Sequence, residues 1–188
     1  RTMAIAHRNT AQWRAMDASH HIHPFCDPKT LAERGVRVIT SADGCFVYDS
    51  DNNKILDGMA GLWCVNVGYG RQELVDVATA QMEQLPFYNS FFQSSTPSQI
   101  ELAQKLSEIA PGNLNHFFFA NSGSEANDTV IRMARHYWHV RGKPKKHKFI
   151  GRHLGYHGST LAATSLGGMK HMHDMGSSML PGFEHIME

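Results

Sequence analysis

The stretch that decides the fold is FFFANSGSEANDTVIRMARHYW, residues 117–138. An apolar aromatic run ends in a small polar cluster, and the residues after the cluster have helical periodicity. The first turn of a helix has unpaired backbone N–H groups and carries partial positive charge. Gly123 lets an anion approach the backbone closely, and Ser122 and Ser124 add hydroxyl donors. The stretch therefore predicts a phosphate-binding cup, made of Ser122, Gly123 and Ser124, at a helix N-terminus.

The same residues also fit an ordinary helix start. In that interpretation Ser122 or Ser124 caps the helix, and the acidic Glu125 and Asp128 favour its dipole. A bound phosphate requires the Glu125 carboxylate to point away from it, and Asp128 is expected to pair with Arg132 one turn on. The local sequence leaves both interpretations open.

The surrounding pattern predicts a parallel sheet. The apolar runs 116–120 and 147–151 are expected to be strands, with a helix over 124–141 between them and another helix beginning near Gly158. Strand–helix–strand order implies right-handed crossovers between parallel strands. The inward face of the helix 124–141 is expected to consist of Ala126, Val130, Met133, Ala134, Tyr137 and Trp138.

A second motif, GRHLGYHGST at 151–160, follows the second predicted strand. Adjacent parallel strands end at one edge of a sheet, so Tyr156 and His157 are expected near the phosphate cup. A flat aromatic ring there suits a ligand that carries both a phosphate and a planar ring. The alternative for Tyr156 is a half-buried loop aromatic.

Upstream, the chain predicts further regular elements. A short helix is expected near 10–18, antiparallel strands over 35–58 with a turn at 49–53, and helices over 72–85 and 97–109. The buried stripe of the helix 97–109 is expected to be Ile100, Ala103, Leu106 and Ile109.

Composition narrows the function classes. The chain has 188 residues, 41% hydrophobic and 19% charged, with a formal net charge of +1. That balance favours neither nucleic acid nor an acidic membrane as partner, and no apolar run reaches spanning length. Three cysteines without close pairing predict reduced thiols in a cytoplasmic protein. No metal site is expected, because the histidine clusters lack an HExxH pattern and a cysteine pair.

Four segments carry a family resemblance: LDGMAGLWCVNVGYG, LPFYNSFF, NSGSEANDTVIRMARHYW and GYHGSTLAATSLGGMK. In these the chain resembles the class III, pyridoxal-phosphate-dependent aminotransferases, and more narrowly the ω-amino acid or amine:pyruvate branch. The resemblance implies an α/β protein of PLP-dependent transferase fold type I, aspartate aminotransferase-like. It further implies an incomplete one, with residues 1–68 as the N-terminal segment of the small domain and 69–188 as the first half of the large, mostly parallel-sheet domain.

The resemblance also implies residue roles. Ser122, Gly123 and Ser124 would hold the phosphate of pyridoxal 5′-phosphate, Tyr156 would stack on its ring, and His157 would lie beside it. The substrate pocket would be lined by Phe25, Leu62, Trp63, Phe91 and Phe92. The alternative for Phe25, Phe91 and Phe92 is ordinary core or interface packing. Family members are dimers with shared active sites, so a homodimer or a dimer of dimers is expected, with Phe92 reaching into the partner subunit's site.

The implied activity is transfer of an amino group from an ω-amine or a diamine such as putrescine to pyruvate. The lysine that forms the Schiff base and the aspartate that pairs with the pyridine nitrogen are expected downstream of Glu188. This chain is therefore expected to hold no catalytic residue and to be inactive alone. The alternative is a non-catalytic remnant that keeps the dimer surface and the phosphate cup.

Overall fold

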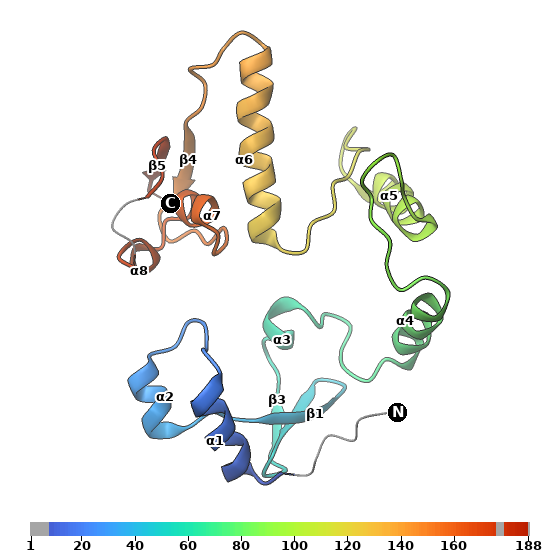
Figure 1. Cartoon of the computed structure of the whole chain (residues 1–188), viewed down its shortest axis with the longest axis vertical. Helices are drawn as coiled ribbons and strands as arrows, with labels where there is room; N and C mark the ends of the chain where they lie inside the picture. The colour runs from blue at the N-terminus through green and yellow to red at the C-terminus, as the bar shows by residue number, and fades with distance from the viewer. Residues whose placement is uncertain (1–7, 176–178, 188) are drawn as a thin grey trace. The chain divides into compact units, whose positions relative to one another are not determined.

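A computed structural model of the chain describes residues 8–175 and 179–187. Its contacts form two compact units, residues 1–89 and residues 90–188 (Figure 1). Helices and strands occur in both units, so the chain is a mixed α/β protein. The domain boundary expected at residue 68 stays a prediction.

The first unit combines helices with a small antiparallel sheet. The Asn9 side chain accepts from the Gln12 backbone N–H and caps the first helix, and Asp27 caps the second, which begins with Pro28. The expected helices near 10–18 and over 72–85 are confirmed. The elements are α1 (Thr10–His20), α2 (Pro28–Arg34), β1 (Ile39–Asp43), β2 (Phe46–Asp49), β3 (Lys54–Leu56), α3 (Ala60–Trp63) and α4 (Gln72–Gln84).

The expected antiparallel strands and their turn are also confirmed. The strands pair in the order β1-β2-β3, and the turn between β2 and β3 is built around the buried Asp49. Its carboxylate accepts from the backbone N–H groups of Asp51 and Asn53 and from the Asn53 side-chain amide, at 2.9–3.1 Å. These bonds satisfy the turn's backbone and fix the register of the hairpin.

The hairpin is expected to lose stability in acid. The side chain and backbone N–H of Asn53 hold the pKa of Asp49 below its ordinary value of 3.8. A lowered pKa contributes stability that is fully present above the ordinary value and is lost as the pH falls through the folded-state value. In Asp49→Asn, which cannot ionise, hydrogen exchange of the β2 and β3 amides should become less dependent on pH below about pH 4. Asp76→Asn, which removes the same charge from α4, should leave that dependence unchanged.

The second unit contains one long helix and a short parallel sheet. Figure 1 shows β4 and β5 side by side near α7, and they pair in parallel from Phe149↔Phe183 to Arg152↔Ile186. The expected helix over 124–141, the helix over 97–109 and the strand near 147–151 are confirmed. The elements are α5 (Pro97–Ile109), α6 (Gly123–Val140), β4 (Phe149–Arg152), α7 (Leu161–Leu166), α8 (Lys170–His173) and β5 (Phe183–Ile186).

The expectation that residues 116–120 form a strand beside 147–151 is wrong for this chain. In the parts of the chain that the structure describes, no segment pairs with 116–120, and the parallel partner of β4 is β5. A strand is stabilised by ladder hydrogen bonds to a neighbour, and an apolar run without such a neighbour remains irregular.

The expected buried faces also need correction. The buried residue of α6 is Ile131, whereas Val130, Met133 and Tyr137 are more than half exposed. On α5, Ile100 and Ile109 of the expected stripe are exposed. These faces have helical periodicity, but within the described residues they are not covered. No helix in the described part of the chain is long and apolar enough to cross a membrane.

Candidate cofactor-binding site

Two side chains, Ser122 and Glu125, accept backbone hydrogen bonds at the N-terminus of α6. The Ser122 hydroxyl accepts from the Glu125 backbone N–H at 3.2 Å, and the Glu125 carboxylate accepts from the Asn121 backbone N–H at 3.0 Å. The capping interpretation of Ser122 is thus confirmed. It does not exclude anion binding, because a hydroxyl that accepts one bond still has its own hydrogen to donate.

Gly123 and Ser124 lie at the first two positions of the helix. Among the described residues, neither backbone N–H has a protein acceptor, and a Cβ built on Gly123 would meet nothing within 4 Å. Two unpaired helix-first-turn donors beside open space are what a phosphate oxygen requires. The local geometry therefore fits the phosphate of the implied cofactor.

The loop that carries the GYHGS motif lies directly against this helix N-terminus. The Ser159 backbone N–H donates to the Ser124 hydroxyl at 3.0 Å, across 35 residues of sequence. Gly158, which is buried, permits the contact, because a Cβ there would lie 2.8 Å from the Ser124 Cα. The two motifs that the sequence singled out are therefore neighbours in space.

Two further α6 residues, Asn127 and Asp128, fix the loop. The Asn127 side-chain amide donates to the His157 carbonyl at 2.6 Å. The Asp128 carboxylate accepts from the Thr160 hydroxyl at 2.8 Å and from the Ala163 backbone N–H at 3.1 Å. The expected surface pair of Asp128 with Arg132 is thus replaced by a cap on α7. The signal in the sequence was the spacing: 124, 127, 128 and 131 lie on one helical face.

Loss of the Asp128 carboxylate is expected to loosen the loop. Asp128→Ala removes the cap of α7 and leaves the Thr160 hydroxyl without its partner, which should cost about 1–2 kcal/mol. Asp128→Asn keeps the accepting oxygen and should cost less than half of that. The measurement is denaturant unfolding of the full-length protein, meaning this chain with any further residues of its reading frame. Equal losses in both variants would show that charge, and not the cap, carries the effect.

Tyr156 and His157 lie in the same loop. Tyr156 is 54% exposed, and the His157 backbone carbonyl accepts from the Asn127 side-chain amide. An exposed ring next to the helix N-terminus has the reach for stacking on a bound planar group. Their roles in binding stay predictions.

The five residues expected to line the substrate pocket are divided between the units. Leu62 and Trp63 are adjacent in α3 and Phe25 lies between α1 and α2, all in the first unit. Phe91 and Phe92 begin the second unit, with ring centroids 6.1 Å apart. All five side chains are more than 60% exposed, so in this chain none of them is a core residue. Their pocket role stays a prediction.

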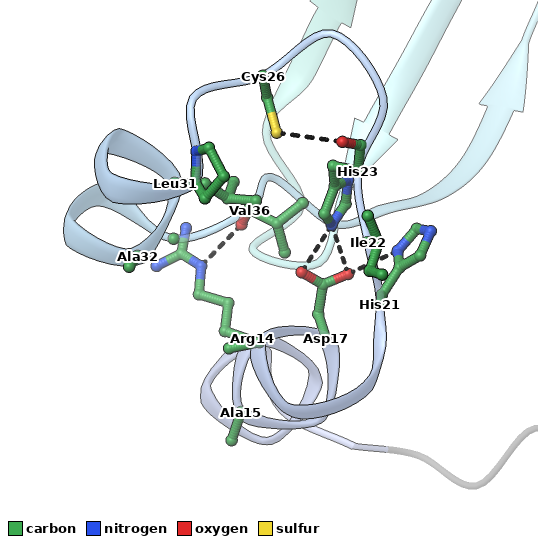
Figure 2. Close-up of a pocket in the computed structure, with 13 residues that line it drawn as sticks. Arg14, Ala15, Asp17, His21, Ile22, His23, Cys26, Leu31, Ala32 and Val36 are labelled. Carbon is green, nitrogen blue, oxygen red and sulfur yellow. Dashed lines mark hydrogen bonds and ion pairs between the residues drawn. The ribbon is translucent and has the colours of Figure 1, made fainter. Parts of the chain in front are cut away.

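The first unit also contains a cluster of metal-ligand type, at a pocket between α1 and α2 (Figure 2). The Asp17 carboxylate contacts the His23 ring nitrogen Nε2 at 2.8 Å and the His21 nitrogen Nδ1 at 3.1 Å. The side-chain bond to His23 holds the pKa of Asp17 below its ordinary value. Three candidate ligand atoms lie within 4.8 Å of one another. Because these groups already hydrogen-bond to each other, the cluster is explained as contacts that hold the loop after α1, and the expectation of no metal site stays a prediction.

Comparison with known proteins identifies the family of this chain. Residues 30–188 match the family model of the class III aminotransferases. The putrescine–pyruvate aminotransferase of Pseudomonas aeruginosa is 56% identical over 98% of this chain, and the β-alanine–pyruvate aminotransferase of the same organism is 41% identical over 79%. The chain belongs to the class III aminotransferases.

The structure of this chain is similar to solved structures of ω-transaminases. An (S)-enantioselective ω-transaminase from Thermomicrobium roseum superposes with a TM-score of 0.94 at 39% identity, over 97% of this chain and 41% of that one. An ω-transaminase from Pseudomonas jessenii in complex with PMP gives 0.91 at 40% identity, over 93% of this chain and 39% of that one. The chain likewise spans 40% and 33% of the length of the two Pseudomonas aeruginosa relatives.

Proposed function

We propose that this chain is the N-terminal part of an aminotransferase that moves an amino group from an ω-amine or diamine to pyruvate. The class III family membership and the 56% identity to a putrescine–pyruvate aminotransferase support this assignment. That relative favours putrescine as the donor over β-alanine, whose aminotransferase is 41% identical.

The observation that carries the proposal is the contact of the Ser159 amide with the Ser124 hydroxyl. It brings the GYHGS loop to the start of α6, where Ser122, Gly123 and Ser124 would bind the phosphate of pyridoxal 5′-phosphate. Tyr156 would hold the pyridine ring from one side, with His157 next to it. When bound, this cofactor supplies an electron sink for the donor carbon, while the residues of this chain bind and orient it.

The remaining active-site groups are assigned outside this chain. The lysine and aspartate that act on the cofactor are proposed to follow Glu188, which makes the chain inactive alone. Phe25, Leu62, Trp63, Phe91 and Phe92 are proposed to line the amine pocket in a homodimer with shared sites. Large apolar side chains on α4 and α5 are exposed, which supports the absence of the residues that would pack on them. These exposed side chains include Leu74, Val75, Met82, Ile100 and Ile109.

The proposal is tested on the full-length protein. The reading frame is first sequenced beyond residue 188, and the protein is then titrated with pyridoxal phosphate. Borohydride should trap a covalent adduct on a lysine of the added segment, and putrescine with pyruvate should yield alanine. Pyridoxal, which lacks the phosphate, should bind at least tenfold more weakly if the first-turn amides of α6 hold that group.

A native stop directly after residue 188, without adduct, would instead leave the chain a non-catalytic remnant. If an adduct forms but pyridoxal and pyridoxal phosphate bind with equal affinity, the assignment as an aminotransferase stands and the proposed phosphate-binding role of Ser122, Gly123 and Ser124 is wrong.

A further inference from the structure

The short helix α3 is a left-handed turn. Ala60, Gly61, Leu62 and Trp63 have φ values of 48°, 59°, 63° and 66°. Side chains of L-residues crowd the backbone in this region, so single occurrences are uncommon and consecutive ones are rarer. Backbone strain of this kind persists only where the surroundings hold it in place.

The Asp57 carboxylate is the group that holds the turn. Its Oδ2 accepts from the Gly61 backbone N–H and from the Tyr69 hydroxyl, both at 2.7 Å, and its Oδ1 accepts from the Met59 backbone N–H at 3.2 Å. The Tyr69 hydroxyl, with the Gly61 N–H, holds the pKa of Asp57 below its ordinary value of 3.8. The carboxylate is therefore ionised at neutral pH, and these bonds are charge-assisted.

Tyr69 in turn connects the left-handed turn to the sheet. Its backbone N–H donates to the Gly44 carbonyl at 2.8 Å, and its carbonyl accepts from the Gly44 N–H at 3.2 Å, at the tip of the β1–β2 hairpin. Gly61 has no room for a side chain, because a Cβ there would lie 2.8 Å from Val65 Cγ2 and 3.1 Å from the Tyr69 hydroxyl. The turn is thus anchored on both sides.

The strained turn presents two apolar side chains, Leu62 and Trp63, to the surface. Leu62 is 64% exposed and Trp63 is 80% exposed. Within the described residues, the strained backbone is therefore not compensated by burial of these two large side chains. The run of four left-handed residues is what distinguishes Leu62 and Trp63 from the other exposed apolar residues, and strain of this kind clusters at ligand-binding positions.

We infer that Asp57 and Tyr69 are positioning residues that hold Leu62 and Trp63 as one wall of the amine pocket. This rests on the proposed function, and it extends that function to residues that do not touch the substrate. The wall suits the methylene chain of an ω-amine, and the Asp57–Tyr69 bond fixes its orientation. Loss of the Tyr69 hydroxyl should therefore act through Trp63.

The test compares Tyr69→Phe with Tyr48→Phe, a matched loss of a hydroxyl on β2 of the same unit. In the full-length protein labelled with fluorotryptophan, the Trp63 ¹⁹F resonance is assigned with Trp63→Phe. Tyr69→Phe should shift or broaden that resonance, and Tyr48→Phe should leave it in place. Kinetically, Tyr69→Phe should raise KM for the amine about fivefold with kcat within about twofold. In a Trp63→Ala background, the same substitution should change KM by less than about twofold.

The two measurements separate the claims. If the wild-type protein moves no amino group to pyruvate, the proposed function fails, and the ¹⁹F resonance alone decides whether Tyr69 positions Trp63. An unmoved Trp63 resonance in Tyr69→Phe overturns the inference whatever the activity. An active enzyme in which Tyr69→Phe raises KM equally with and without Trp63 overturns it as well, since the effect would then not pass through the wall.

Discussion

Gly151→Ala is expected to destabilise the second unit by about 3 kcal/mol, at the upper end of what overpacking costs. Gly151 is a buried residue of β4, and α7 packs against it. A Cβ at this position would overlap with the Leu166 carbonyl oxygen and lie 3.1 Å from His185 Cδ2. The Leu166 carbonyl belongs to the backbone, so relief requires a shift of α7 or of β4.

The loss should appear locally as well as globally. Hydrogen exchange of the β4 and β5 amides in the full-length protein should accelerate in Gly151→Ala, because the parallel ladder opens more often. Gly58→Ala is the matched control, since a Cβ at Gly58 meets nothing within 4 Å. Unchanged exchange in β4 would mean that α7 has room to move, contrary to the close packing described above.

The sequence predicted local elements well because their signals are local. Asn9 caps the predicted helix α1, Pro97 starts α5, and the polar residues after Asp49 make a turn in any context, whereas α2 was not predicted. The neighbourhood of Ser124 and Ser159 followed from a topological rule and the family resemblance, although the strand at 116–120 that the rule assumed is missing here.

The features that could not be predicted from the sequence depend on contacts with residues distant in the chain. The buried face of α6 is decided by the loop it contacts, so Asp128 became a cap for α7 and not a surface ion pair. Burial of Ile100 and Ile109 requires covering residues that the described chain does not supply. The backbone strain at Leu62 and Trp63 has no sequence signal beyond nearby glycines.

Gly158→Ala is expected to separate the GYHGS loop from α6 and to weaken cofactor binding. The φ of Gly158 is 133°, a conformation that residues with a side chain rarely adopt. A Cβ there would also lie 2.5 Å from the Ser124 hydroxyl and 2.8 Å from Ala163 Cβ. The loop must therefore move, and the Ser159–Ser124 bond is lost together with the placement of Tyr156.

The affinity of the full-length protein for pyridoxal phosphate should fall by about 10- to 100-fold, the equivalent of one or two lost charge-assisted bonds. Exchange of the α7 amides should accelerate with it, because the loop and α7 are held by the same face of α6. Absorbance titration of the cofactor and hydrogen exchange measure the two effects in one protein preparation.

Gly123→Ala is expected to weaken binding of pyridoxal phosphate at the same site without lowering the stability of the fold. Its Cβ enters open space at the first position of α6, so stability should be unchanged or slightly higher. The methyl group would nevertheless occupy the approach to the first-turn amides, and affinity for pyridoxal phosphate should fall by about tenfold while affinity for pyridoxal is retained. If Gly123→Ala binds both compounds as the wild type does, the phosphate does not lie on this helix. If only Gly158→Ala weakens binding, and does so for both compounds, the loop acts on the ring and not on the phosphate.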